Sequence, residues 1–175
     1  MISMRTIRQG IPLWFRCFKG NKDSDAFKLD TIKEGITYVS NLFDNEFQLI
    51  FLADRWFNST KLMGHIDCLW HTYRLRLKGN LKVTYFDNVK KHNVETYTQN
   101  LSGKKYQCKY YKAISCTENN YKTNIVISAS IGSLAPWIIA TNSDVKRAVK
   151  DYSYRFGAIY EKLNIMRSLK KNPLI

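Results

Sequence analysis

The segment Phe47-Gln-Leu-Ile-Phe-Leu-Ala53 limits the fold of this chain more than any other part of the sequence. Its side chains are apolar apart from Gln48, a pattern typical of a central strand that is covered on both faces. Asp54 follows directly, and Asn58 or Ser59 can cap a helix after it. The segment therefore predicts a buried strand that ends in a carboxylate, at the edge where open α/β sheets place their ligand sites.

The residues on either side of this strand predict two helices and two further strands. Apolar side chains recur at steps of three and four over residues 25–43, and again from Leu62 to Trp70. Residues 11–18 and 72–78 have the composition and spacing of strands. The order strand, helix, strand, helix, strand implies right-handed crossovers and a largely parallel sheet.

The pattern of the sequence changes between about residue 81 and about residue 142. Short β-prone segments alternate there with turn residues, as in Asn124-Ile-Val-Ile-Ser128 and Trp137-Ile-Ile-Ala-Thr141. We expect a β-rich insertion or an antiparallel extension of the sheet. Asn142 or Ser143 then caps a helix with Val145, Ala148, Val149 and Tyr152 on one face, which continues toward Lys171.

Length and charge narrow the class of protein. A chain of 175 residues with 45% hydrophobic side chains suits one domain, residues 1–175. A net charge of +14 favours a polyanion as partner, with nucleic acid first and an anionic membrane second. Because the apolar runs are far shorter than the roughly 20 residues of a transmembrane helix and no secretory signal begins the chain, we expect a cytoplasmic protein.

The cysteines and histidines do not predict a metal site. Four cysteines and three histidines are scattered without zinc-ligand spacing, so we expect reduced and mostly buried thiols.

The carboxylate of Asp54 has two interpretations. It can complement the dipole of the helix that follows, or it can be a ligand for Mg²⁺, which prefers carboxylate oxygens. Two-metal phosphodiester chemistry would need further acids that converge from other elements.

Five segments in order resemble DDE transposases of bacterial insertion sequences, in the branch with a β-rich insertion and a Tyr-Arg-Glu-Lys signature. They are IPLWFRCFKG, LADRWF, YRLRLKGN, PWIIATN and YSYRFGAI, between about Ile11 and Ile159. The resemblance implies an α/β fold with an RNase H-like mixed sheet, flanking helices and a β-rich insertion at about 81–142. It also implies two Asp and one Glu that bind Mg²⁺ or Mn²⁺ and cut and rejoin DNA at the transposon ends.

The resemblance assigns roles to single residues. Asp54 matches the second Asp of the family, and Tyr152 and Arg155 match signature residues that lie near transposon-end phosphates. A packed aromatic and a surface charge on an amphipathic helix are equally good interpretations of Tyr152 and Arg155. Implied partners are DNA and, in the intact family, a second subunit; the implied location is the bacterial nucleoid.

Further DNA contacts are suggested by the residues themselves. Arg74, Arg76 and Lys78 form a basic cluster that can follow a DNA backbone, although solvation explains any one of them. Trp137 can stack on a base, but a tryptophan packed in the core is the more common case.

Two departures from the family weaken the catalytic expectation. No acidic residue precedes Asp23, so the first Asp and its strand are expected to be missing. Tyr160 stands at the position of the Glu, and Glu161 follows it, turned by about 100° on a helix. We therefore predict that this chain alone is a catalytically incomplete fragment. A non-enzymatic basic DNA-binding protein, a degraded reading frame that does not fold, and a nuclease of another RNase H-like family remain alternatives.

Overall fold

The computed structural model describes residues 1–5, 10–16, 25–44, 46–57, 59–84, 92–93, 108–116, 119–128 and 136–155. The chain divides into two compact units. The first comprises Met1–Phe47 and Ser153–Ile175, and the second comprises Gln48–Tyr152. The described part of the chain contains no helix that is long and apolar enough to cross a membrane.

The first unit contains an antiparallel strand pair and one helix. Strand β1 (Ile2–Arg5) pairs with β2 (Gly10–Trp14), and α1 (Asp25–Asn41) is the helix that the apolar spacing predicts over 25–43. Gly35 is needed within α1 because a Cβ there would lie 2.6 Å from the Trp14 ring. Glycine lowers the helix propensity at this position, but it lets α1 pack closely against β2.

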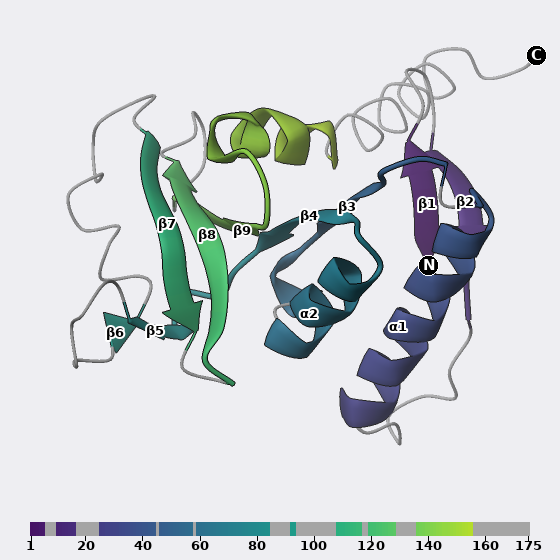
Figure 1. The fold of residues 1–175 in the computed structure, drawn as a ribbon, viewed down its shortest axis with the longest axis horizontal. Helices are drawn as coiled ribbons and strands as arrows, with labels where there is room; N and C mark the ends of the chain where they lie inside the picture. The colour runs from purple at the N-terminus through teal and green to yellow at the C-terminus, as the bar shows by residue number, and fades with distance from the viewer. Residues whose placement is uncertain are drawn as a thin grey trace, which may run out of the picture. The chain divides into compact units, whose positions relative to one another are not determined.

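The second unit is built on a seven-stranded sheet of order β3-β4-β9-β8-β7-β5-β6 (Figure 1). Its strands are β3 (Ile50–Ala53), β4 (Thr72–Arg76), β5 (Lys82–Thr84), β6 (His92–Asn93), β7 (Cys108–Cys116), β8 (Tyr121–Ser128) and β9 (Trp137–Thr141). The fold is mixed α/β. Only β3 and β4 are parallel, and the other neighbouring strands are antiparallel.

The expectation of a largely parallel sheet is therefore wrong, and that of an antiparallel extension is confirmed. Helix α2 (Thr60–Cys68) is the crossover between the parallel strands β3 and β4. After β4 the chain makes antiparallel pairs, chiefly β7 with β8 and β8 with β9, which need no crossover helix. The alternation of strand and helix before residue 80 cannot predict how the later strands pair.

Strand β3 lies at the edge of this sheet and not at its centre. Its side chains are only partly covered, and Ile50 is 47% exposed. The strand is also shorter than the apolar run, because Phe47 and Gln48 precede it and are exposed. An apolar run shows that a strand tolerates burial on both faces, but it does not specify the neighbours that will cover it.

Two helices cover opposite faces of the central strands (Figure 1). Leu62, Met63 and Ile66 of α2 are buried on one side. Residues 145–155 form the second helix, in which Val145, Ala148 and Tyr152 are buried as its spacing predicts. The core between them is formed by apolar side chains of the sheet, which include Leu75, Ile125, Ile127, Ile139 and Ala140.

Strand β1 precedes β2 and carries no acidic residue, so it does not supply the first Asp of the family. One smaller expectation needs correction, because the thiols are less buried than expected. Of the three cysteines in the described part of the chain, Cys116 is buried, Cys108 is partly covered and Cys68 is exposed; all three are free.

Candidate nucleic-acid interface

Asp54 lies at the carboxyl end of β3, where the chain turns into a short 3₁₀ helix of Arg55–Phe57. Its side chain is partly exposed, and its Oδ1 accepts a hydrogen bond of 2.7 Å from the backbone N–H of Arg55. Its carbonyl oxygen accepts another, of 2.9 Å, from the backbone N–H of Phe57. Asp54 therefore shapes the turn that displays the next three side chains.

The parallel pairing of β3 and β4 brings two cations to this turn. Ala53 pairs with Leu75, so the following residues, Asp54 and Arg76, come at the same end of neighbouring strands. Lys78 follows on the same chain segment, and its Nζ lies 5.1 Å from the centroid of the Trp56 ring. This is a cation–π contact, which holds the ammonium over the face of the ring.

The turn exposes two aromatic side chains beside these cations. Trp56 is 76% exposed and Phe57 is 38% exposed, while Arg55 is also exposed. We call Asp54, Arg55, Trp56, Phe57, Arg76 and Lys78 the Asp54 surface. It combines three cations with one carboxylate and an accessible indole, the combination with which proteins follow a nucleic-acid backbone and stack on bases.

Sequence reasoning found Asp54, Arg76 and Lys78 but missed the aromatic residues between them. The signal was present, because Trp56 and Phe57 follow Asp54 directly in LADRWF. Aromatic side chains are usually assigned to a core from sequence, and only the short 3₁₀ turn places these two in solvent.

Arg74 does not belong to this surface, because its side chain is buried. Its guanidinium lies 3.1 Å from Asp151 Oδ2, donates to Ser143 Oγ at 2.9 Å and also donates to Thr141 Oγ1. Burial lowers the pKa of Arg74, and the neighbouring Asp151 opposes that shift. Arg74 thus joins β4 to the second helix and is not available to a DNA backbone.

The remaining predicted site residues are Tyr152, Trp137, Arg155 and Glu161, and the antiparallel register of β4 and β9 brings Trp137 next to Lys78. Tyr152 is fully buried, and its ring packs edge-on against Trp137 with centroids 5.4 Å apart. This packing agrees with the core interpretation of Tyr152, whereas Trp137 is only partly covered. Arg155 is partly exposed and falls in the first unit. Glu161 lies outside the described residues.

The described residues do not form a metal site around Asp54. No group of three His, Cys, Asp or Glu side chains in this part of the chain is close enough to hold an ion. Mg²⁺ is usually bound by one or two carboxylates together with substrate phosphates, and catalytic pairs of ions need several acids. Asp54 is one carboxylate, which is fewer than a catalytic pair of ions would need from the described residues.

A polar network that the sequence did not indicate ties α2 to the sheet. The Asp67 carboxylate accepts hydrogen bonds from Tyr121 Oη and from Asn142 Nδ2. Tyr73 Oη lies 2.8 Å from Thr123 Oγ1 and 3.3 Å from Tyr121 Oη. Burial raises the pKa of Tyr73 to about 12 and also raises that of Tyr121. These phenols stay protonated near neutral pH, so the network is structural.

His71 of this unit allows a test of stability against pH. His71 is buried before β4, where its Nδ1 accepts a long hydrogen bond of 3.4 Å from the backbone N–H of Leu49. Burial lowers its pKa, so the unfolded chain binds this proton more readily than the folded chain. We expect the free energy of unfolding to fall as the pH drops below about 6.5, by at most about 1.4 kcal/mol per pH unit.

Urea unfolding between pH 7.5 and 5 measures this effect. His71→Gln, which keeps an acceptor but cannot charge, should flatten the profile relative to the native chain. His65→Gln on α2 is the matched control and should leave the His71 contribution in place. An unchanged slope in His71→Gln would contradict the assignment.

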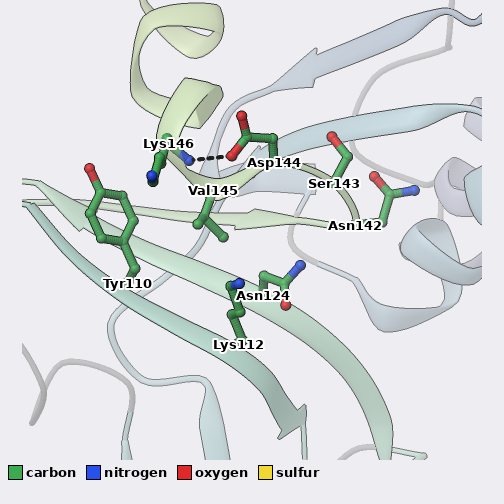
Figure 2. Close-up of a pocket in the computed structure, with 8 residues that line it drawn as sticks. All are labelled: Tyr110, Lys112, Asn124, Asn142, Ser143, Asp144, Val145 and Lys146. Carbon is green, nitrogen blue, oxygen red and sulfur yellow. Dashed lines mark hydrogen bonds between the residues drawn. The ribbon is translucent and has the colours of Figure 1, made fainter.

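A hollow of about 440 Å³ lies elsewhere on the same unit, between β7, β8 and the start of the second helix (Figure 2). Asp144 caps that helix, because its Oδ1 accepts from the backbone N–H of Lys146 at 2.9 Å. The side-chain amides of Asn124 and Asn142 bond to the backbone of Ala113 and Tyr73. Asp144 and the two asparagines therefore stabilise the fold, and we take the Asp54 surface as the stronger candidate.

Comparison with known proteins adds no assignment. No protein-family model matches the chain, and no curated protein matches its sequence.

Proposed function

We propose that this chain binds DNA through the Asp54 surface, as an RNase H-like fragment of a DDE transposase that does not catalyse strand cleavage alone. The observation that carries the proposal is Trp56, which is 76% exposed and has Lys78 over its ring at the carboxyl end of β3. Trp56 and Phe57 are adjacent in the chain and both exposed, so they form an apolar patch beside the cations and not a single exposed side chain. A base stacked on the Trp56 ring would cover part of that patch.

The charges around Trp56 suit the phosphates on either side of such a base. Arg55 is exposed on the same 3₁₀ turn, and Arg76 lies beside Asp54 at the end of β4. The whole chain carries +14, so its long-range field attracts a polyanion. Arg55 and Lys78 can then make phosphate contacts that hold the chain on the strand. A DNA segment with unpaired bases, as at an opened transposon end, supplies both a base that can stack on Trp56 and phosphates that can contact the cations.

Metal-dependent strand transfer would need acids that the described residues do not place near Asp54. In the family that the sequence resembles, Mg²⁺ or Mn²⁺ bound by three carboxylates supplies the phosphodiester chemistry. The second candidate function, a non-enzymatic basic DNA-binding protein, is favoured by the three cations of the Asp54 surface against its one carboxylate. Both candidates share the DNA surface and differ only in ancestry and in the need for metal.

Salt dependence of binding tests the surface. We expect affinity for single-stranded DNA to fall linearly with salt on a logarithmic scale, with or without Mg²⁺. Arg55→Gln combined with Lys78→Gln should reduce the steepness of that line by about 1.4, because each phosphate contact on a single strand contributes about 0.7. Fluorescence anisotropy of a labelled oligonucleotide measures both quantities.

A control pair removes the same charge elsewhere in the unit. Lys112→Gln with Lys146→Gln, at the hollow of Figure 2, should change the slope much less. Equal losses in the two pairs would show that DNA binding is not localised at the Asp54 surface.

A nicking assay with Mg²⁺ or Mn²⁺ tests the proposal that this chain alone does not cleave DNA strands. Cleavage by the native chain that disappears in Asp54→Ala would overturn the assignment of a catalytically incomplete fragment.

A further inference from the structure

The hollow of Figure 2 is formed entirely by residues of the second unit. Its volume is about 440 Å³, within the range of roughly 300–1,000 Å³ in which small-molecule sites usually fall. The eight residues that line it all belong to Gln48–Tyr152, so no residue of the first unit forms its wall. The hollow can therefore be interpreted from one compact unit.

Two lysines bring positive charge to the hollow from different elements. Lys112 belongs to β7, and Lys146 belongs to the first turn of the second helix. Both side chains are exposed, and among the described residues neither ammonium group has an ion-pair or hydrogen-bond partner. Asp144 is the acidic residue of the lining, and its Oδ1 already accepts from the backbone N–H of Lys146. The helix N-terminus thus has its own anion, and the two ammonium groups remain for an anionic ligand.

A β-bulge positions Lys112 at the hollow. The register of β7 against β8 shifts at this point, so Lys112 and Ala113 together lie opposite the single residue Asn124. Ala113 has a φ of 52°, a left-handed conformation that is unfavourable for a residue with a Cβ, and its N–H donates to Asn124 Oδ1 at 3.0 Å. Bulges change the direction of neighbouring side chains and are frequent beside functional sites. The Asn124 side chain therefore fixes the strand where Lys112 meets the hollow.

An aromatic side chain supplies an apolar wall. Tyr110 lies on β7 two residues before Lys112, lines the hollow and is 45% exposed. The buried Val145 also lines it, and in the view of Figure 2 it lies between Tyr110 and Asn124. A tyrosine ring is a surface on which a planar ring of a ligand can stack. Apolar surface with a few separate charged groups is the composition of a small-molecule site.

We propose that this hollow binds a small aromatic phosphate, such as a free nucleoside monophosphate, with its ring on Tyr110 and its phosphate at Lys112 and Lys146. A phosphate monoester carries nearly two negative charges near neutral pH, which matches two ammonium groups. A single carboxylate would leave one of these cations without a partner. The inference does not depend on DNA binding, because none of the three residues belongs to the Asp54 surface.

Calorimetric titration of the full chain with adenosine monophosphate (AMP), in the absence of DNA, tests the proposal. We expect a Kd between roughly 10 and 1,000 µM, the range of weak to moderate complexes. Adenosine lacks the phosphate and inorganic phosphate lacks the ring, so each should bind at least about 10-fold more weakly than AMP. In NMR spectra, the backbone amide signals of Lys112 and Val145 should shift as AMP is added.

Variants locate the site. Lys112→Gln combined with Lys146→Gln should weaken AMP binding by at least about 10-fold, because both partners of the phosphate are removed. Tyr110→Ala should weaken it by about 5-fold or more, the lower end of what one stacking ring contributes. These side chains are exposed, so the fold should persist, which circular dichroism checks. The matched control is Arg55→Gln with Lys78→Gln, which removes the same charge at the Asp54 surface and should leave AMP affinity unchanged.

Three results would overturn the proposal. They are the absence of binding at millimolar AMP, equal affinity for AMP and inorganic phosphate, and equal losses of AMP affinity in the two double variants. Because these measurements contain no DNA, their failure would leave the proposed DNA surface in place. Conversely, a native chain that does not bind DNA could still bind AMP at the hollow.

Discussion

Arg74→Met is expected to lower the free energy of unfolding by about 3–5 kcal/mol, because it leaves a buried carboxylate without its main partner. The side chains of Arg74 and Asp151 are 3% and 7% exposed, and the guanidinium also bonds to Ser143 and Thr141. Urea unfolding followed by circular dichroism measures the loss. Asp151→Asn should cost a similar amount, since it leaves the buried cation without a counter-charge.

Arg147 provides a matched control for this experiment. Its guanidinium lies 4.0 Å from the same Asp151 carboxylate, but its side chain is 72% exposed. Arg147→Met should therefore cost less than about 1 kcal/mol, as exposed ion pairs do. The double variant Arg74→Met with Asp151→Leu should recover part of the loss, because no unpaired charge remains buried. Equal costs for Arg74→Met and Arg147→Met would contradict the buried network.

Trp56→Ala is expected to weaken binding of single-stranded DNA by about 1–3 kcal/mol, or about 5- to 150-fold, as the loss of one base-stacking ring does. The ring is 76% exposed, so its removal leaves no cavity and should not change stability. Anisotropy of a labelled oligonucleotide measures the affinity. Trp56→Phe should retain much of it, because a smaller aromatic face remains.

Trp70 is the control for this variant, since it is an exposed tryptophan of the same unit that lies outside the Asp54 surface. It follows α2 in the turn before β4, with a φ of 59°. Trp70→Ala should leave DNA affinity within about twofold, which corresponds to less than 0.5 kcal/mol. If Trp70→Ala lost as much affinity as Trp56→Ala, or if neither changed it, stacking on the Asp54 surface would not be the mode of binding.

Much of the second unit follows from local patterns. The three- and four-residue spacing of α2 and of the helix from residue 145 predicted which side chains are buried. Strand β9 was predicted with its observed bounds, and β8 was predicted from Asn124 although it begins at Tyr121. Such elements are predictable because adjacent residues in the chain set their periodicity. Strand β1 was not predicted, because four residues carry too little pattern.

The candidate site was predicted only in part. Asp54, Arg76 and Lys78 do lie together, because a strand end and a parallel neighbour bring them to one place. Arg74 lies two residues from Arg76 on β4 but is buried against Asp151, 77 residues later in the chain. No local pattern could distinguish these arginines. A long-range partner decided which of them is available to DNA.

The amino-acid sequence was sufficient for the mixed α/β class, the two helices of the second unit, the carboxylate at the end of β3 and the basic charge of the chain. These depend on periodicity, propensity and composition, which are properties of neighbouring residues. Tertiary structure alone decided that β3 lies at an edge, that Arg74 is internal and that Trp56 is exposed. Those outcomes depend on pairing and burial between distant segments, where desolvation and hydrogen-bond geometry determine which group meets water.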